Sequence, residues 1–282
     1  MTDTTLEAQR SGAPAERRTR GTALTDALHA EWTKLRTVSG PSWLLLAVAV
    51  LTVAVSTAAV GATHCPGSMQ CPVDTTKLSL TGIQFGQAVV AILAVLAICN
   101  EYSTGMIRVT LAAMPRRWTV LAAKAAIIAG LVLAAAAVAA LGSVLAGQLI
   151  LPGHGFTAAR GFHAISLGYG PTLRAASGSV LYLALIALLS LGIAAIVRYS
   201  AVSIGAVLAV LYIFPLVLAF VTNTQWQRRL ERWAPTTAGL TIQDTTGMRH
   251  LPIGPWGGLG VLALWTVGAL AAGGLALRLR DA

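Results

Sequence analysis

Residues 175–197 read AASGSVLYLALIALLSLGIAAIV and contain no charged side chain. The run is bounded by Arg174 and Arg198. The hydrocarbon core of a bilayer is about 30 Å thick, and a helix that crosses it needs about 20 mostly apolar residues. The run is continuous and rich in Ala and Leu, whereas a membrane-spanning strand alternates apolar and polar residues. This stretch therefore predicts a transmembrane α-helix.

Five further stretches of similar length also lack Asp, Glu, Lys and Arg. They cover residues 43–62, 80–99, 125–151, 201–222 and 256–277. Of the 282 residues, 56% are hydrophobic and 11% are charged, whereas soluble domains carry about 25% charged residues. This composition disfavours a soluble enzyme and excludes a disordered chain. We expect an all-α polytopic membrane protein whose transmembrane domain, residues 41–282, contains six helices.

The 20 basic residues predict the sidedness of the connecting segments. Six spans place both termini on one side, and basic residues concentrate in cytoplasmic segments. With a cytoplasmic N-terminus, only 7 of the 20 lie outside and 13 lie inside; the outer set is Lys77, Arg160, Arg174, Arg228, Arg229, Arg232 and Arg249. We expect a multi-pass protein of the plasma membrane with both termini cytoplasmic and a disordered tail over residues 1–21. The net charge of +10 is then explained by the basic residues that set the orientation in the membrane. We therefore expect no nucleic-acid partner.

Residues 22–40 precede the first span and have an amphipathic pattern. Leu24, Leu28, Trp32 and Leu35 recur at helical spacing on one face, and charged residues occupy the remainder. This pattern predicts a helix that lies at the cytoplasmic membrane surface. The alternative is a simple extension of the first span.

The segment between the second and third spans, residues 99–124, reads CNEYSTGMIRVTLAAMPRRWTVLAAK. It combines apolar residues such as Met106 and Leu111 with basic residues and one acidic residue, Glu101. A short helix with apolar and charged faces, carried between two spans, suits docking on a cytoplasmic partner. The alternative is an ordinary basic loop that only sets topology.

The chain from about residue 24 onward resembles the membrane subunit of ATP-binding-cassette exporters, the type-2 permease class, and its actinobacterial members in particular. The resemblance is carried by HAEWTKLRTVSGPSWLL (29–45), NEYSTGMIRVTLAAMPRRWTVLAAK (100–124) and ALRLRDA (276–282). It implies that the loop after the second span forms a coupling helix on an ATPase subunit. By position, Glu101 and Gly105 match the acidic residue and glycine of that loop, and Arg108 follows them. The alternative for Glu101 is a plain charge at the membrane interface.

The sequence contains no G-x-x-x-x-G-K-[ST] phosphate loop, so we expect no ATPase site on this chain. The resemblance implies that ATP and its magnesium bind a separate subunit. No Asp, Glu or His lies within the spans as bounded above, which disfavours a proton-driven transporter. We therefore expect a permease subunit rather than an enzyme, with no cofactor of its own.

Residues outside these patterns yield four smaller predictions. Gln84 and Gln87 share one helix face and serve either a cargo path or a contact with a neighbouring helix. Cys65 and Cys71 lie outside in this topology and are candidates for a disulfide, with two free thiols as the alternative. No paired spacing of His and Cys indicates a metal site. Pro215 should interrupt the fifth helix.

The long outer segment, residues 223–255, contains a second amphipathic pattern. Trp226, Leu230 and Trp233 recur at helical spacing among arginines, which predicts an interfacial helix. The resemblance implies short helices here that partly re-enter the membrane.

These features together predict the transmembrane subunit of an ATP-driven exporter of an amphipathic or hydrophobic substrate. Its partners would be a cytoplasmic ATPase subunit, the lipid membrane, and a second permease, either identical or different. The alternative is a membrane scaffold or sensor that recruits a cytoplasmic partner without transport.

Overall fold

The computed structural model describes most of the chain outside its N-terminal segment: residues 39–65, 71, 73–106, 117–157, 161–163, 165–220, 222–247 and 251–279. Within these ranges the chain is helical and no strand occurs. Six helical segments are long and apolar enough to cross a membrane, so the predicted fold class is confirmed. The predicted tail (1–21), almost all of the predicted interfacial helix (22–40), and Arg108 lie outside the described residues.

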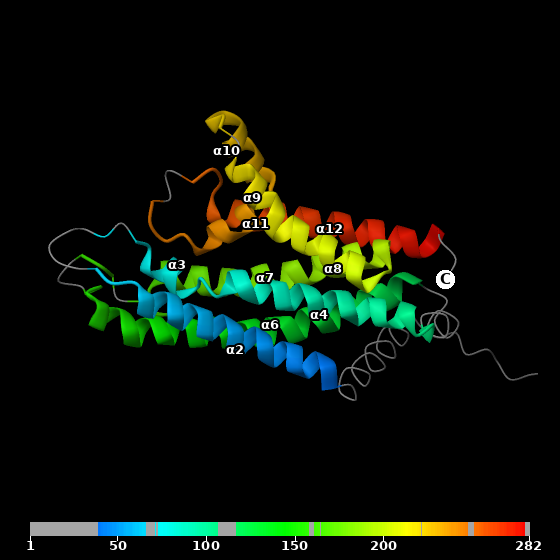
Figure 1. Cartoon of the computed structure of the whole chain (residues 1–282), viewed down its shortest axis with the longest axis horizontal. Helices are drawn as coiled ribbons and strands as arrows, with labels where there is room; N and C mark the ends of the chain where they lie inside the picture. The colour runs from blue at the N-terminus through cyan, green and yellow to red at the C-terminus, as the bar shows by residue number, and fades with distance from the viewer. Residues whose placement is uncertain are drawn as a thin grey trace, which may run out of the picture.

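Six segments of the chain form the bundle seen in Figure 1. They are α2 (Ser39–Ala62), α4 (Ile83–Ser103), α6 (Arg117–Ile150), α7 (Gly170–Val197), the fifth span, and α12 (Pro255–Leu279). The fifth span consists of α8 (Ser200–Leu208), η3 (Ala209–Ile213) and α9 (Phe214–Ala219). The shorter elements are α3 (Thr75–Ser79), η1 (Leu151–His154), α10 (Thr224–Trp233), α11 (Pro235–Leu240) and η4 (Thr241–Gln243).

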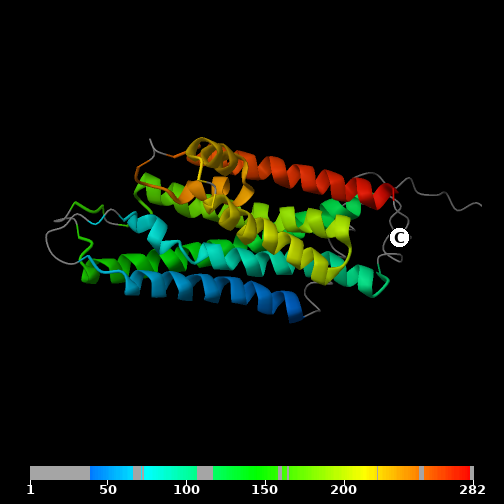
Figure 2. The same ribbon diagram turned by 45° about the horizontal axis from the view of Figure 1, so that its top comes forward.

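Helix α7 is the core of the bundle, because α4, α6 and α12 all pack directly against it. Its side chains Leu183, Ile186 and Leu191 have no exposed surface. Helix α2 packs only on the α4 and α6 side and lies at the edge of the bundle, as the rotated view in Figure 2 shows. The segment that is most apolar in the sequence thus becomes the helix that other helices surround.

Small residues set the closest helix contacts. A Cβ atom at Gly192 of α7 would lie 2.6 Å from the backbone carbon of Ala269 in α12, and one at Gly82 would lie 1.9 Å from the carbonyl oxygen of Thr52 in α2. Neither distance is tolerated by a side chain, so glycine permits the backbones to approach. The α7–α12 and α2–α4 crossings therefore depend on these two glycines.

The fifth span is interrupted as Pro215 predicts. Proline cannot donate a backbone hydrogen bond to the preceding turn, and η3, which ends two residues before Pro215, is a turn of π-helix. The α-helix resumes as α9, with Pro215 in its first turn. This break places Tyr212, a residue of η3, against α4, where its hydroxyl donates to the carbonyl oxygen of Gln84.

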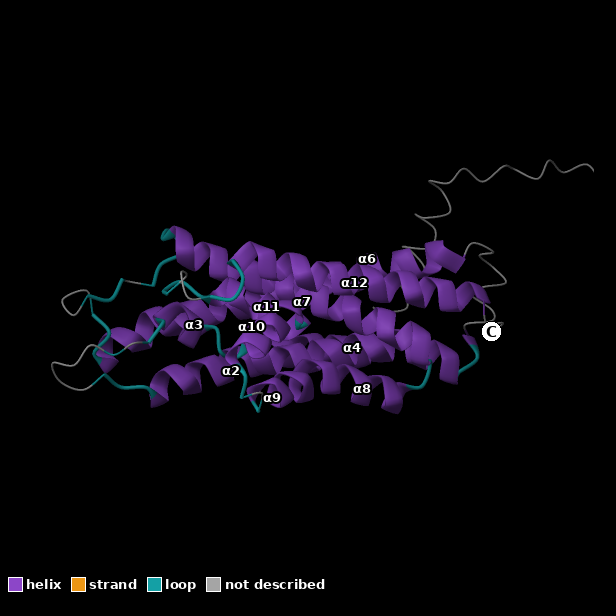
Figure 3. Ribbon diagram, turned by 90° about the horizontal axis from the view of Figure 1, so that it is seen from above, coloured by secondary structure: helices purple, strands orange, loops and turns teal. Residues whose placement is uncertain are grey.

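The two ends of the bundle differ in what they contain. One, here called the disulfide end, carries Cys65, Cys71, α3 and η4; the other, the ion-pair end, carries the last turns of α4 and the first turns of α6. The long helices run side by side between these two ends, as Figure 3 shows from above. The deep-blue start of α2 and the red end of α12 both lie toward the ion-pair end, as Figure 1 shows. An even number of spans accounts for this placement.

Candidate functional site

Glu101 of α4 and Lys124 of α6 form an ion pair at the ion-pair end, with 3.0 Å between Nζ of the lysine and Oε1 of the glutamate. Both residues are buried: Glu101 is 7% exposed and Lys124 is 5% exposed. Burying either charge alone would be strongly unfavourable, and a close opposite charge offsets much of that penalty. The pair therefore fixes α4 to α6 at the two helix ends that flank residues 107–116.

Both charged residues lie beyond the apolar limits predicted for their spans. The second and third spans were bounded at residues 99 and 125, but α4 continues to Ser103 and α6 begins at Arg117, so Glu101 and Lys124 both lie inside helices. Helix α4 thus carries one acidic residue, Glu101, beyond the apolar run that ends at residue 99. The sequence names no partner for Glu101, and the structure pairs it with Lys124.

One feature of the sequence distinguishes Lys124 from the other basic residues. Lys124 is the sole charged residue in the apolar stretch that follows Trp118 in α6, two helical turns after the helix begins. Glu101 lies in the last turn of α4. Because the two helices run in opposite directions, residues near the end of one and the start of the other meet at similar depth. The ion pair forms only when α4 and α6 are aligned in this way, and the sequence does not reveal that alignment.

Gly105 ends α4 rather than extending it. Its φ is +70°, a left-handed conformation that glycine adopts without strain, and its N–H donates to the carbonyl oxygen of Tyr102. The chain thus leaves the helix immediately after Glu101 and Tyr102. Arg108, the third residue predicted for coupling, lies outside the described residues, so the structure places Glu101 and Gly105 at the end of α4 but does not place Arg108.

Arg198 extends the contacts at this end to two more helices. It ends α7 with a φ of +69°, and its guanidinium lies 5.2 Å from the centroid of the Tyr102 ring in α4. The same group donates to the carbonyl oxygen of Ala276 in α12 at 3.1 Å. A cation over an aromatic ring within about 6 Å is attracted to it. Sequence reasoning counted Arg198 only as a topology charge, whereas it joins α4, α7 and α12.

Trp118 completes the set from the first turn of α6. Arg278 of α12 lies over its ring at 5.3 Å, and a side chain at Gly274 of α12 would collide with that ring. The contacts from Trp118, Lys124, Tyr102 and Arg198 therefore connect four helices, α4, α6, α7 and α12, within the ion-pair end.

The two glutamines of α4 lie in the first two turns of that helix and have different partners. Gln87 is 1% exposed, and its side-chain oxygen accepts from the hydroxyl of Tyr182 in α7. Gln84 contributes its backbone carbonyl, which accepts from Tyr212. Gln87 thus makes a contact between helices, the second of the two roles that the sequence left open for it.

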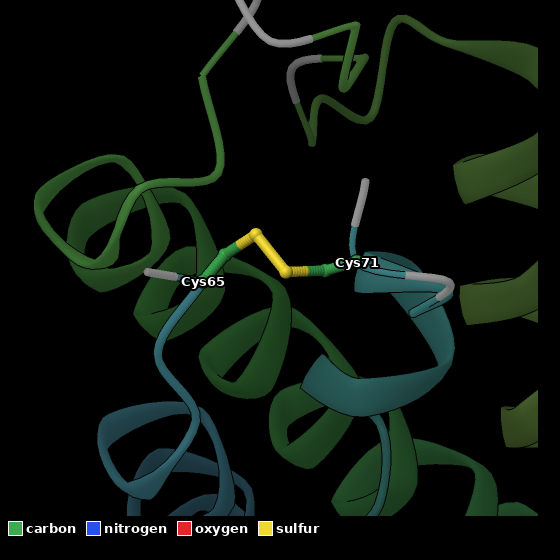
Figure 4. Close-up of a disulfide and its surroundings, with 2 residues drawn as sticks. All are labelled: Cys65 and Cys71. Atoms are coloured by element: carbon green, nitrogen blue, oxygen red, sulfur yellow. A yellow bond between two sulfur atoms is a disulfide. The ribbon is translucent and has the colours of Figure 1, made fainter. Parts of the chain in front are cut away.

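The disulfide end is held together by a covalent bond and by hydrogen bonds to one carboxylate. Cys65 and Cys71 are joined, with 6.1 Å between their Cα atoms, as Figure 4 shows. Asp74 begins α3 and accepts hydrogen bonds from the N–H groups of Thr76 and Lys77. It also accepts from the N–H and hydroxyl groups of Thr245 and Thr246, which follow η4. The two connecting segments are thereby held together.

Burial and hydrogen bonding act in opposite directions on Asp74. Burial alone would raise the pKa of this carboxyl, but the bonds from the Thr245 hydroxyl and from the backbone N–H groups of Lys77, Thr245 and Thr246 outweigh it and lower the pKa. The carboxylate therefore stays ionised in the folded protein at neutral pH. A second carboxylate, Asp244, accepts from Nζ of Lys77 at 2.6 Å.

The structure describes no group of three or more metal-ligating side chains within the ranges given above. The rings of His64 and His154 lie near the disulfide, with 4.2 Å between their centroids, and Cys65 and Cys71 are bonded to each other. No protein-family model matches the chain, and no curated protein is detectably similar to it. A functional assignment therefore depends on the residues of the chain itself.

Proposed function

We propose that this chain is the membrane subunit of an ATP-driven exporter of the type-2 ATP-binding-cassette class. A separate ATPase subunit would hydrolyse ATP, and a second permease chain, identical or different, would complete the transport path. The observation that carries the proposal is the buried Glu101–Lys124 pair, which bridges the two helices on either side of the segment expected to dock on the ATPase.

The pair offers a physical route for transmitting motion. A force applied to residues 107–116 reaches α4 and α6 together, because their adjacent ends are joined by a buried charge pair. Tyr102, next to Glu101, extends the route through Arg198 to the end of α12. Helices linked in this way move as a group rather than singly, which is what opening and closing of a transport path requires.

The distribution of charge supports an amphipathic or hydrophobic cargo. The charged residues in the described spanning helices lie within about two turns of a helix end, and the remaining middle sections are apolar with a few amide and hydroxyl groups. A path built from such helices offers no full charge to a polar ion. The lack of charge in these middle sections agrees with energy supplied by a separate ATPase.

The test is assembly followed by hydrolysis. The full chain would be co-expressed with a phosphate-loop ATPase encoded beside its gene, purified by a tag on the permease and reconstituted in nanodiscs. We expect stoichiometric co-purification and ATP hydrolysis that Glu101→Gln lowers about tenfold or more, because the buried Lys124 then loses its carboxylate partner. The exchanged pair, Glu101→Lys with Lys124→Glu, should recover part of the loss. Lys77→Gln, at the opposite end, serves as the matched control.

Two outcomes contradict the proposal. Failure of any such ATPase to co-purify would exclude the assembly, and unchanged hydrolysis in Glu101→Gln would exclude the coupling role. Transport of hydrophobic dyes in vesicles distinguishes an exporter from the remaining alternative. Partner binding with no ATP-dependent movement of the dyes would identify a scaffold or sensor.

A further inference from the structure

An apolar groove lies on the outside of the bundle, between α7, η3 and α12, with a volume of about 450 Å³. Its walls include Ile193 of α7, Val210 of the π-helical turn η3, and Val261 of α12. The described lining residues are all apolar or glycine, apart from the indole N–H groups of two tryptophans. The volume lies within the range of ligand pockets. The groove therefore suits a hydrocarbon chain rather than a polar molecule.

The end of α10 forms the mouth of the groove. Trp233, the last residue of α10, lines it together with Trp265 of α12, and the indole N–H of Trp265 donates to the carbonyl oxygen of Trp233 at 2.9 Å. This bond fixes α10 to the groove and satisfies the polar group of Trp265. The two rings are 66% and 50% exposed, so the mouth opens away from the bundle core.

Gly268 provides part of the open space. A Cβ atom at this position would meet no other atom within 4 Å, although Gly268 lines the groove. The α12 lining residues run from Val261 to Ala269, about 12 Å along the helix, and α10 approaches them at Trp265. A chain entering beside α10 can therefore extend along α12 at the depth of the membrane interior.

Helix α10 is strongly basic and projects sideways from the bundle, across the direction of the long helices, as Figure 1 shows. Arg228, Arg229 and Arg232 are exposed. The only acidic residue of the helix, Glu231, accepts from the side chain of Gln227. At about 100° per residue, the three arginines fall within one sector of the helix, beside the face that carries Trp233. This arrangement places positive charge next to the mouth of an apolar groove.

We propose that the groove and α10 form a binding site for an anionic phospholipid, with one acyl chain in the groove and the phosphate held by the three arginines. Guanidinium groups bind phosphate oxygens in a bidentate manner, which favours arginine at such sites. An amphipathic helix with tryptophan on one face and arginine beside it is suited to the headgroup level of a bilayer. The site is independent of any ATPase and goes beyond the proposed function.

The acyl-chain half of the site is tested by filling the groove. The full chain would be reconstituted with equal amounts of phosphatidylglycerol and phosphatidylcholine, and bound lipid would be counted by native mass spectrometry. We expect Gly268→Leu to reduce bound phosphatidylglycerol about tenfold. Gly260→Leu is the matched control, because Gly260 lies on the same helix, also has open space at its Cβ, and does not line the groove.

The headgroup half is tested by charge. The triple variant Arg228→Gln, Arg229→Gln, Arg232→Gln should lose about tenfold in its preference for phosphatidylglycerol over phosphatidylcholine, whereas the three lysine substitutions should retain most of it. Equal binding of the two lipids by the unmodified protein would overturn the proposal, as would undiminished lipid in Gly268→Leu. A change from dimer to monomer mass in Gly268→Leu with no change in bound lipid would identify the groove as a contact between chains instead, and would also overturn it.

Discussion

The disulfide end and the ion-pair end are both cross-linked, but their bonds join different parts of the chain. At the disulfide end, Cys65–Cys71 and Asp74 tie connecting segments to each other, since Asp74 receives bonds from Thr245 and Thr246. At the ion-pair end, Glu101–Lys124 joins the helices themselves. The first arrangement immobilises the connections between spans. The second joins the two helix ends that lie on either side of residues 107–116.

The difference matters because the two kinds of bond depend differently on their surroundings. A disulfide and a cluster of hydrogen bonds to one carboxylate hold their geometry in water. A buried ion pair is held in place by the unfavourable free energy of leaving either charge alone in an apolar interior. We therefore expect the ion-pair end to be the more sensitive to single substitutions.

The largest effect is expected from Glu101→Gln, which removes the carboxylate that pairs with the buried Lys124. It should lower the free energy of unfolding in detergent micelles by about 3–5 kcal/mol. Replacing both partners, as in Glu101→Gln with Lys124→Met, should recover most of that loss because no buried charge then remains. A double variant as unstable as the single one would show that the charge pair is not the source of the effect.

The next effect is expected from the disulfide. Replacing Cys65 and Cys71 with serine opens a loop with a sequence separation of 6 residues, and the entropy of the unfolded chain then rises by an amount equivalent to about 2 kcal/mol. Thermal unfolding with and without a reductant measures this. The reductant should lower the melting temperature of the unmodified protein and leave the serine variant unchanged; equal shifts in both would contradict the assignment.

Asp74 should contribute about 1–2 kcal/mol, since it caps α3 and accepts bonds from the segment after η4. Its folded pKa is lowered, so its stabilising contribution is fully present above the ordinary pKa of aspartate, about 3.9, and is lost as the pH falls through the folded value. Stability measured from pH 6 to pH 3 should fall more steeply in the unmodified protein than in Asp74→Asn. Parallel curves would contradict this role.

The smallest effect is expected from Lys77, whose side chain is 45% exposed in its ion pair with Asp244. Lys77→Gln should change the free energy of unfolding by less than about 1 kcal/mol, and by less still in high salt, because solvent screens exposed charges. A loss comparable to that of Glu101→Gln would remove the distinction between the two ends.

Predictions from the sequence pattern were confirmed where a single local property of a segment determines its structure. The six apolar stretches became spanning helices because a bilayer requires length and low charge, both of which are visible in a single stretch. Pro215 lies directly after a π-helical turn because the missing N–H acts within its own helix. The span boundaries were less accurate, since helices α4 and α6 continue past the apolar limit when their charged residues find partners.

The partners of individual residues could not be predicted, because they lie on segments that are far apart in the sequence. Gln87 meets Tyr182 across 95 positions in the sequence, and Asp74 meets Thr245 across 171. Neither pair has a spacing that reveals it. The lipid groove, likewise, exists only because α7, η3, α10 and α12 converge, and no single segment carries a signal for it.

The sequence by itself determined that this chain crosses a membrane as an all-α bundle, because hydrophobic length and charge depletion act on each helix independently of the others. Tertiary structure alone decided what each polar residue does. Glu101, for which the sequence allowed a plain charge at the membrane interface, is buried. The alignment of α4 and α6 brings Nζ of Lys124 to 3.0 Å from its Oε1. In an apolar interior a charge is stable only beside its partner, and the partner is chosen by packing.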